Sequence, residues 1–374
     1  MYPVLPLRCR LDDFTGYGQF SVALADALFQ LRQELGFSLR VHPILTDFRH
    51  SPMPEQLAPC ISRCRNHPEP WELLLYPMTL GDEAPAPGKR TVAWTMWEST
   101  QLPAYALRRM NRCSLVLVPS GWGAAILSAC GLQPNVRVAQ LGIPSHWHQE
   151  GLPQDPGATG TVVFGTAGRF AGGGQRKGFD TVLQAFANAF PEDTAQHVRL
   201  EIKAFGDCPV RQPRDPRVRL IQDHWSRQQL VDWYHILHAY VSASSGEGWG
   251  LHQQEAMANA RPLIAPLWSG LCEFLNPANG VLVDYRLAPG TGVYHNLGHM
   301  GEPTTQGLTH ALRHAEHEIR HNFQAWQRKC LQARDAARYW SIDTCARHLV
   351  ELLRTEGFLT QAPAHHPSTT PLAS

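Results

Sequence analysis

The feature that most constrains the fold is an alternation of short apolar segments with helix-like stretches, which occurs twice along the chain. Such alternation is typical of a parallel sheet with helices on both faces. In the first half, Ser120 is predicted to be the N-cap of a helix. The segments predicted there are strands at 4–10, 38–44, 73–76, 91–97 and 115–118, and helices at 18–35, 104–112 and 121–130.

The alternation stops at residues 146–160, which contain prolines and glycines and few apolar residues, and this segment is predicted to be an interdomain linker. It then resumes, and a helical region runs from about 305 to 353 with a break near Trp340–Ser341. The sequence therefore predicts two doubly wound α/β domains, one at 1–145 and the other at 161–340. The second contains predicted strands at 161–166, 198–205, 218–221, 239–242, 262–265 and 281–283, and helices at 178–190, 226–237 and 251–259.

Composition excludes several classes of protein. Charged residues are 17% of the 374, and the formal net charge is +1, which argues against electrostatic binding of nucleic acid. The nine cysteines contain no Cys-x-x-Cys pair, so no metal site is predicted. An odd number of cysteines without a recognisable secretion signal indicates reduced thiols, and a cytoplasmic location is expected. The tail at 361–374, rich in Pro, Ser, Thr and Ala, is predicted to be disordered.

The most informative segment is 244–258, where a predicted strand ends in a glycine-rich turn and a helix begins. The turn contains Glu247 and lets the backbone approach a ligand closely. The helix start, at Trp249, Gly250 and Leu251, offers unpaired N–H groups to a phosphate or a sugar hydroxyl. Glu255 lies about one turn further on. The alternative is a packed turn followed by a solvent-exposed glutamate.

A second segment, 165–178, has a similar position after a strand and before a helix. It combines glycines, Gly168 among them, with Arg169 and Lys177. Cations in a loop of this kind suit a diphosphate, to which they would make charge-assisted hydrogen bonds. A flexible surface loop is the alternative interpretation.

Two weaker candidates lie in the first half. Gly16-x-Gly18 follows the first strand, but Ser21 occupies the position of the third glycine of a dinucleotide-binding fingerprint, so a plain tight turn explains it equally well. Glu98 follows the strand at 91–97, at the carboxyl end of the sheet where ligands bind in α/β folds. It would either bind a substrate or cap the next segment.

Taken together, these segments resemble the GT-B glycosyltransferases, and specifically the large retaining family 4. The resemblance rests on Gly168-Arg169…Lys177-Gly178 and on Glu247, seven residues, Glu255. It extends over about residues 10–355. Three departures stand out: the cationic loop is longer than usual, Trp249 replaces a common Phe, and Glu98 lies roughly where many members have a His. Further matching segments are 255–258, 261–265, 270–283, 95–100 and 118–122.

The resemblance implies two Rossmann-like domains facing each other across a cleft, with a final helix at about 341–356 crossing back to the first. It implies a metal-independent retaining hexosyltransferase that needs no cofactor. The donor would be a nucleoside diphosphate sugar, and the acceptor a glycan, a lipid-linked group or a protein, in polysaccharide or glycoconjugate synthesis. Peripheral membrane association is compatible with such a role, and nucleic acid is not a partner.

In this family-based interpretation, Arg169 and Lys177 would stabilise the departing diphosphate. Glu247 would bind the donor sugar, Glu255 the ribose, and Glu98 would act on the acceptor side. The donor would also contact the glycines at 16, 18, 168 and 250 and the N–H groups of Trp249–Leu251.

Other functions remain open at this stage. A glycoside hydrolase would use Glu247 and Glu255 as its carboxylate pair, but it has no need of a cationic loop. A non-catalytic protein that binds nucleotide sugars or glycans could have the same fold. An NAD-dependent oxidoreductase rests on Gly16-x-Gly18 alone, and epimerases and phosphorylases share the architecture.

Overall fold

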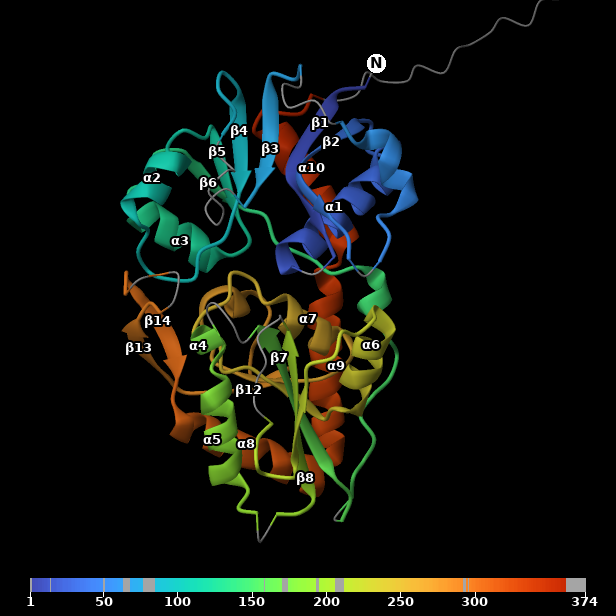
Figure 1. Cartoon of the computed structure of the whole chain (residues 1–374), viewed down its shortest axis with the longest axis vertical. Helices are drawn as coiled ribbons and strands as arrows, with labels where there is room; N and C mark the ends of the chain where they lie inside the picture. Colours follow the sequence, from blue (N-terminus) through green and yellow to red (C-terminus); the bar gives the residue numbers. More distant parts are fainter. Residues whose placement is uncertain are drawn as a thin grey trace, which may run out of the picture.

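The computed structural model describes residues 2–360 except 14, 50, 63–67, 77–84, 158, 170–173, 193–194, 206–211, 292–293 and 295. It contains two α/β domains stacked along the long axis of the molecule (Figure 1). Each has a six-stranded sheet in which neighbouring strands are parallel. The predicted pair of doubly wound domains is confirmed. The tail at 361–374 lies outside the described residues.

The first domain has the strand order β2-β1-β3-β4-β5-β6. Its central strand β3 (Trp71–Leu75) is buried along its whole length, as expected for a parallel strand covered on both faces. Ser120 caps its helix as predicted, accepting a hydrogen bond from Gly123 N at 3.0 Å. The other elements are β1 (Val4–Asp12), α1 (Gly16–Leu31), β2 (Ser38–Asp47), β4 (Arg90–Trp94), α2 (Ala104–Met110), β5 (Leu115–Val118), α3 (Gly121–Ala129) and β6 (Asn135–Val138).

The second domain has the order β12-β11-β10-β7-β8-β9. Its strands are β7 (Val162–Arg169), β8 (Val198–Phe205), β9 (Val218–Ile221), β10 (Ala239–Val241), β11 (Leu263–Ala265) and β12 (Gly280–Leu282). Its helices are α4 (Gly174–Lys177), α5 (Phe179–Ala189), α6 (Arg227–Ile236), α7 (Leu251–Ala258), α8 (Thr305–His321) and α9 (Phe323–Tyr339). A separate antiparallel pair, β13 (Tyr285–Pro289) and β14 (His299–Pro303), stands beside them.

The last helix, α10 (Ile342–Thr355), packs on α1 of the first domain, to which the chain returns (Figure 1). At the crossing, Ile143 pairs with Ser341, and a Cβ on Gly142 would lie 2.6 Å from the Ser341 carbonyl oxygen. Only glycine permits that approach.

Three features differ from the predictions. The first is β6 (Asn135–Val138), an edge strand of the first sheet that was not predicted and whose residues alternate between exposed and half-buried. The helical region breaks at Asn322 as well as near Trp340, because the Asn322 side chain accepts a hydrogen bond from Ala325 N and starts α9 as its N-cap. The hairpin of β13 and β14 was not predicted. β13 is largely exposed, and β14, although mostly buried, has the sequence His-Met-Gly-Glu-Pro, so neither strand has the apolar run that marks the central strands.

Candidate functional site

The carboxyl ends of the two sheets face each other where the domains meet, and the glycine-rich turn of the second domain packs against the first. A Cβ on Gly246 would lie 2.9 Å from the Glu98 carbonyl oxygen, and one on Gly248 would lie 2.4 Å from Met96 Sδ. These glycines therefore allow the loop after β4 to contact the turn that carries Glu247.

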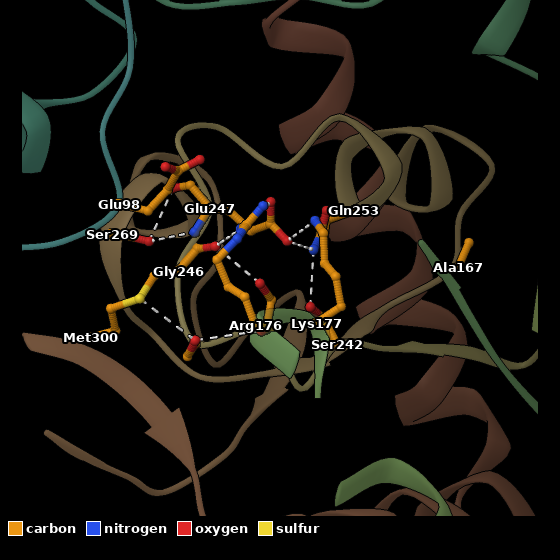
Figure 2. Close-up of polar contacts among 12 residues, drawn as sticks. Glu98, Ala167, Arg176, Lys177, Ser242, Gly246, Glu247, Gln253, Ser269 and Met300 are labelled. Atoms are coloured by element: carbon orange, nitrogen blue, oxygen red, sulfur yellow. Dashed lines mark hydrogen bonds and ion pairs between the residues drawn. The ribbon is translucent and has the colours of Figure 1, made fainter. Parts of the chain in front are cut away.

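The centre of this region is an ion cluster around Glu247 (Figure 2). Lys177 Nζ lies 2.5 Å from Glu247 Oε1, and Arg176 Nη1 lies 3.5 Å from Glu247 Oε2. Arg176 also donates a hydrogen bond to the Gly246 carbonyl. Both cations come from α4, seventy residues away in the sequence.

Neighbouring polar groups fix the orientation of Glu247. Its backbone N–H donates to Ser269 Oγ at 2.9 Å, and the same hydroxyl donates to the Glu247 carbonyl at 3.0 Å. Gln253 Nε2 donates both to Glu247 Oε1 at 3.2 Å and to Ser242 Oγ at 2.9 Å. Because backbone and side chain are both anchored, the carboxylate is preorganised.

The cluster also sets the charge of Glu247. Burial alone would raise its pKa, but Lys177 and Arg176 outweigh burial and lower the pKa to about 2. Burial likewise opposes the charge of Arg176, yet Glu247 and Glu98 raise its pKa above the usual value. The carboxylate and the guanidinium are therefore both ionised at neutral pH.

Glu255 occupies a separate position deeper in the second domain. Tyr234 donates its hydroxyl hydrogen to Glu255 Oε2 at 3.0 Å, and His252 Nδ1 lies 3.1 Å from the same oxygen. The His252 ring stacks on Phe205 at the end of β8, with centroids 5.1 Å apart. Glu255 is only 6% exposed, so the alternative of a solvent-exposed glutamate is wrong.

At the start of α7, between the two glutamates, some residues pack in the interior of the protein and others face the domain boundary. Gly250 has φ 103°, a left-handed conformation that favours glycine, and α7 begins at the next residue. The Trp249 side chain is buried against Phe274 and Trp340, so its backbone N–H is what it has to offer a ligand. Leu251 faces the first domain, 4.0 Å from a Cβ placed on Gly16.

Close packing against Asp12 explains why residue 18 is a glycine. A Cβ there would lie 2.2 Å from the Asp12 carboxyl carbon. Asp12 in turn holds the turn by accepting from Thr15 N at 2.8 Å, and Thr15 caps α1. The tight-turn interpretation therefore accounts for Gly18, whereas Gly16 lies at the domain boundary.

Glu98 is buried at this boundary, with an exposed fraction of 6%. Its carboxylate accepts a hydrogen bond from the hydroxyl of Tyr294, which belongs to the second domain. The two domains therefore meet at a carboxylate of the first and a phenol of the second.

Residues 161–289 match the model of the family Glycosyl transferases group 1. Over these residues, about a third of the chain, the second domain is similar to a glycosyl transferase domain of that group. That stretch runs from the start of β7 to the end of β13 and contains the cluster around Glu247. No curated protein matches the chain at a significant level.

Three solved structures are similar to the chain over almost its whole length, and they establish the fold as GT-B. A sucrose-phosphate synthase from Thermosynechococcus elongatus has 16% identity and a TM-score of 0.64, covering 94% of this chain and 98% of its own. WaaG, a glycosyltransferase involved in lipopolysaccharide biosynthesis, has 13% identity and a TM-score of 0.62 over 93% and 99%. HepE from Anabaena, in complex with UDP and glucose, has 15% identity and a TM-score of 0.60 over 94% and 100%.

Within the glycosyl transferase domain, the two predicted cations differ in placement. Lys177 is in the cluster, and its side chain packs along Gly168, where a Cβ would lie 3.5 Å from Lys177 Cγ. Arg169, the last residue of β7, is exposed, and its side chain has no hydrogen bond or ion pair with another described residue. The arginine that joins Lys177 is its neighbour Arg176.

Sequence reasoning did not single out Arg176, Gln253 or Tyr294. Arg176 adjoins Lys177 in the same segment as Arg169, and no sequence signal indicates which of the two arginines joins Lys177. Gln253 lies two residues before Glu255. Tyr294 follows an unpredicted hairpin strand, so no sequence signal linked it to Glu98.

The glycosyl transferase domain thus presents cations, a fixed carboxylate and a helix N-terminus near one another. Such a set favours an anionic ligand that also has hydroxyl groups. In the part of the chain that the structure describes, no three His, Cys, Asp or Glu side chains are arranged to bind a metal ion. Among the same residues, no helix is long and apolar enough to span a bilayer.

Proposed function

We propose that this protein transfers a hexose from a nucleoside diphosphate sugar to an acceptor hydroxyl with retention of anomeric configuration. The observation that carries the proposal is the cluster of Lys177, Arg176 and Glu247 beside the N-terminus of α7, within a group 1 glycosyl transferase domain. HepE was crystallised with UDP and glucose, and a pneumococcal O-GlcNAc transferase of similar fold with UDP and GlcNAc, which favours a nucleotide sugar as the donor.

The cations would act on the leaving group. When the bond between the sugar C1 and the phosphate oxygen breaks, the electron pair stays on the diphosphate, and its negative charge rises. Lys177 and Arg176 stabilise this charge more in the transition state than in the ground state, which lowers the barrier. Arg169, exposed at the end of β7, would contact the diphosphate from the solvent side. The charge is neutralised in this way without a metal ion.

Retention requires the acceptor oxygen to bond to C1 on the face that the diphosphate leaves. The acceptor proton then passes to the departing phosphate oxygen, which has just gained the electron pair. Glu247, fixed by Gln253 and Ser269, would hold the donor-sugar hydroxyls in this geometry. Glu255 would accept hydrogen bonds from the ribose.

The first domain would bind the acceptor, with Glu98 as the polar group nearest the reacting atoms. Glycans, lipid-linked sugars and proteins all offer suitable hydroxyls. The similarity to WaaG, a glycosyltransferase involved in lipopolysaccharide biosynthesis, favours a role in a bacterial surface polysaccharide or glycoconjugate. Cytoplasmic synthesis at the membrane surface, through peripheral association, accords with such an acceptor.

A thermal-shift screen over nucleoside diphosphates and their sugars tests this function, because a ligand at one hundred times its Kd stabilises the folded state by about 2.7 kcal/mol. We expect one base to raise the melting temperature clearly. Incubation of the matching sugar donor with acceptor glycans, followed by NMR of the product, then gives the anomeric configuration. A screen in which no diphosphate shifts the melting temperature would contradict the proposal.

A further inference from the structure

The hairpin of β13 and β14 is attached to the acceptor side of the first domain. Its backbone pairs with the loop that follows β4: Thr100 N donates to the His299 carbonyl at 3.0 Å, and His299 N donates to Thr100 Oγ1 at 2.9 Å. Gly298, with φ 66°, lies so close to this loop that a Cβ would be 2.5 Å from Ser99 Oγ. The hairpin therefore contacts the first domain at close range, although it belongs to the second.

This attachment brings Tyr294 to Glu98. The Tyr294 ring packs edge-on against Trp97, with centroids 4.9 Å apart, and its hydroxyl donates to Glu98 Oε2. Burial and the neighbouring carboxylate of Glu98 both raise the pKa of Tyr294 well above its usual value, so the phenol retains the proton that it donates. Only 5% of Tyr294 is exposed, and bulk water therefore competes little for this hydrogen bond.

From this geometry we infer that Tyr294 is a positioning residue for Glu98. This inference rests on the proposed function, since Glu98 is assigned there to the acceptor. One oxygen of the carboxylate is held by the phenol, so the side chain has a defined orientation and the other oxygen is available to an acceptor hydroxyl. The acceptor carboxylate is thus supplied by one domain and oriented by the other, and its orientation depends on the hairpin being seated.

The position of Arg176 supports this assignment. The charges of Glu98 and Glu247 both raise the pKa of Arg176, so the guanidinium responds to both carboxylates. Without the Tyr294 hydrogen bond, Glu98 would be free to turn towards this cation and away from an acceptor. The phenol therefore keeps the acceptor carboxylate separate from the donor cations.

A double-mutant cycle between Tyr294→Phe and Glu98→Gln tests the inference. The Phe variant keeps the ring against Trp97 and removes only the hydroxyl. We expect kcat with the acceptor to fall by about 10- to 100-fold, as for a misplaced group, while the Kd of the nucleoside diphosphate changes less than about twofold. In the Glu98→Gln background the same change should have less than about a twofold effect on kcat, because the group it positions is gone.

Tyr285→Phe is the matched control, since Tyr285 lies on the same hairpin, is 39% exposed and packs on Trp268 away from Glu98. It should retain wild-type kinetics. An undiminished effect of Tyr294→Phe in the Glu98→Gln background would overturn the inference, and so would a parallel loss of diphosphate affinity or kinetics equal to those of Tyr285→Phe.

Failure of the proposed function would look different: the wild-type protein itself would neither bind a nucleoside diphosphate nor transfer a sugar. The contact between Tyr294 and Glu98 can also be tested without substrate, by thermal unfolding of wild type, Tyr294→Phe, Glu98→Gln and the double variant. Non-additive changes in melting temperature support the Tyr294–Glu98 contact, and additive changes contradict it.

Discussion

The two halves of the proposed site are built differently. The donor half lies within one domain, where Lys177, Arg176 and Gln253 each contact Glu247 directly. The acceptor half is shared, because Glu98 comes from the first domain and its hydrogen-bond donor Tyr294 from the second. Donor binding should therefore depend on the interior of one domain, whereas acceptor chemistry should depend on how the two domains meet.

The largest effect expected is that of Lys177→Ala on the donor half. Removing a preorganised donor to a developing anion costs about 2–4 kcal/mol in the free energy of activation, which is roughly 30- to 1000-fold in kcat/KM. Lys329→Ala is the matched control, because Lys329 lies on α9 of the same domain but donates to the Pro277 carbonyl instead of to Glu247. Equal steady-state kinetics for the two variants would remove Lys177 from the site.

The second prediction ranks the two arginines. Arg176→Ala should lower kcat/KM by about 10- to 100-fold, because a partly buried cation that pairs with Glu247 is lost. Arg169→Ala should cost less, about threefold to tenfold, since an exposed cation is screened by water and salt. Measuring kcat/KM of both variants at low and high salt sharpens the comparison, because salt screens the exposed Arg169 more than Arg176. If Arg169 proves the more important, the cluster around Glu247 is not where the diphosphate binds.

The third prediction separates the glutamates by role. Glu247→Gln should mainly reduce kcat, because its charge lies beside the leaving-group cations. Glu255→Gln should mainly weaken nucleotide affinity, by about 10-fold for one lost charged hydrogen bond. Calorimetric titration of the nucleoside diphosphate and transfer kinetics distinguish the two effects. The reverse pattern, with affinity lost in Glu247→Gln and rate lost in Glu255→Gln, would exchange the roles.

The smallest effect concerns stability and pH. The pKa of Glu247 is lowered to about 2 in the folded protein from an ordinary 4.5, so its ionic contribution to stability is present above about pH 4.5. That contribution is lost as pH falls from there towards 2. The difference in melting temperature between wild type and Glu247→Gln should therefore shrink between pH 5 and pH 3. A difference that stays constant over this range would show that the cations do not hold the pKa down.

The sequence predicts more of the donor half of the site, which lies in one domain, than of the acceptor half, which two domains share. The strand–helix alternation predicted both sheets except for the edge strand β6, because apolar periodicity is a local property of the chain and β6 lacks it. Glu247 and Lys177 were predicted because each lies in a glycine-containing segment between a strand and a helix. Their direct contact required the fold, since seventy residues separate them.

Tyr294 shows where local reasoning ends. β13 of its hairpin is mostly exposed, and β14 is mostly buried but has no apolar run. The hairpin's position is set by pairing with a loop almost two hundred residues earlier. Arg169 shows a second limit, because the sequence placed two arginines in one loop without indicating which would be buried. Side-chain burial within a loop depends on tertiary packing, which propensity does not encode.

The central claim is that Lys177 and its neighbours bind a nucleoside diphosphate without a metal ion. It is tested most directly by calorimetric titration of the base selected in the thermal screen, with excess EDTA, into wild type, Lys177→Ala and Lys329→Ala. We predict the same Kd for wild type and Lys329→Ala, a Kd at least about 10-fold weaker for Lys177→Ala, and no change on replacing EDTA with Mg²⁺ or Mn²⁺. Binding that requires the metal, or that is equal in all three proteins, would contradict the claim.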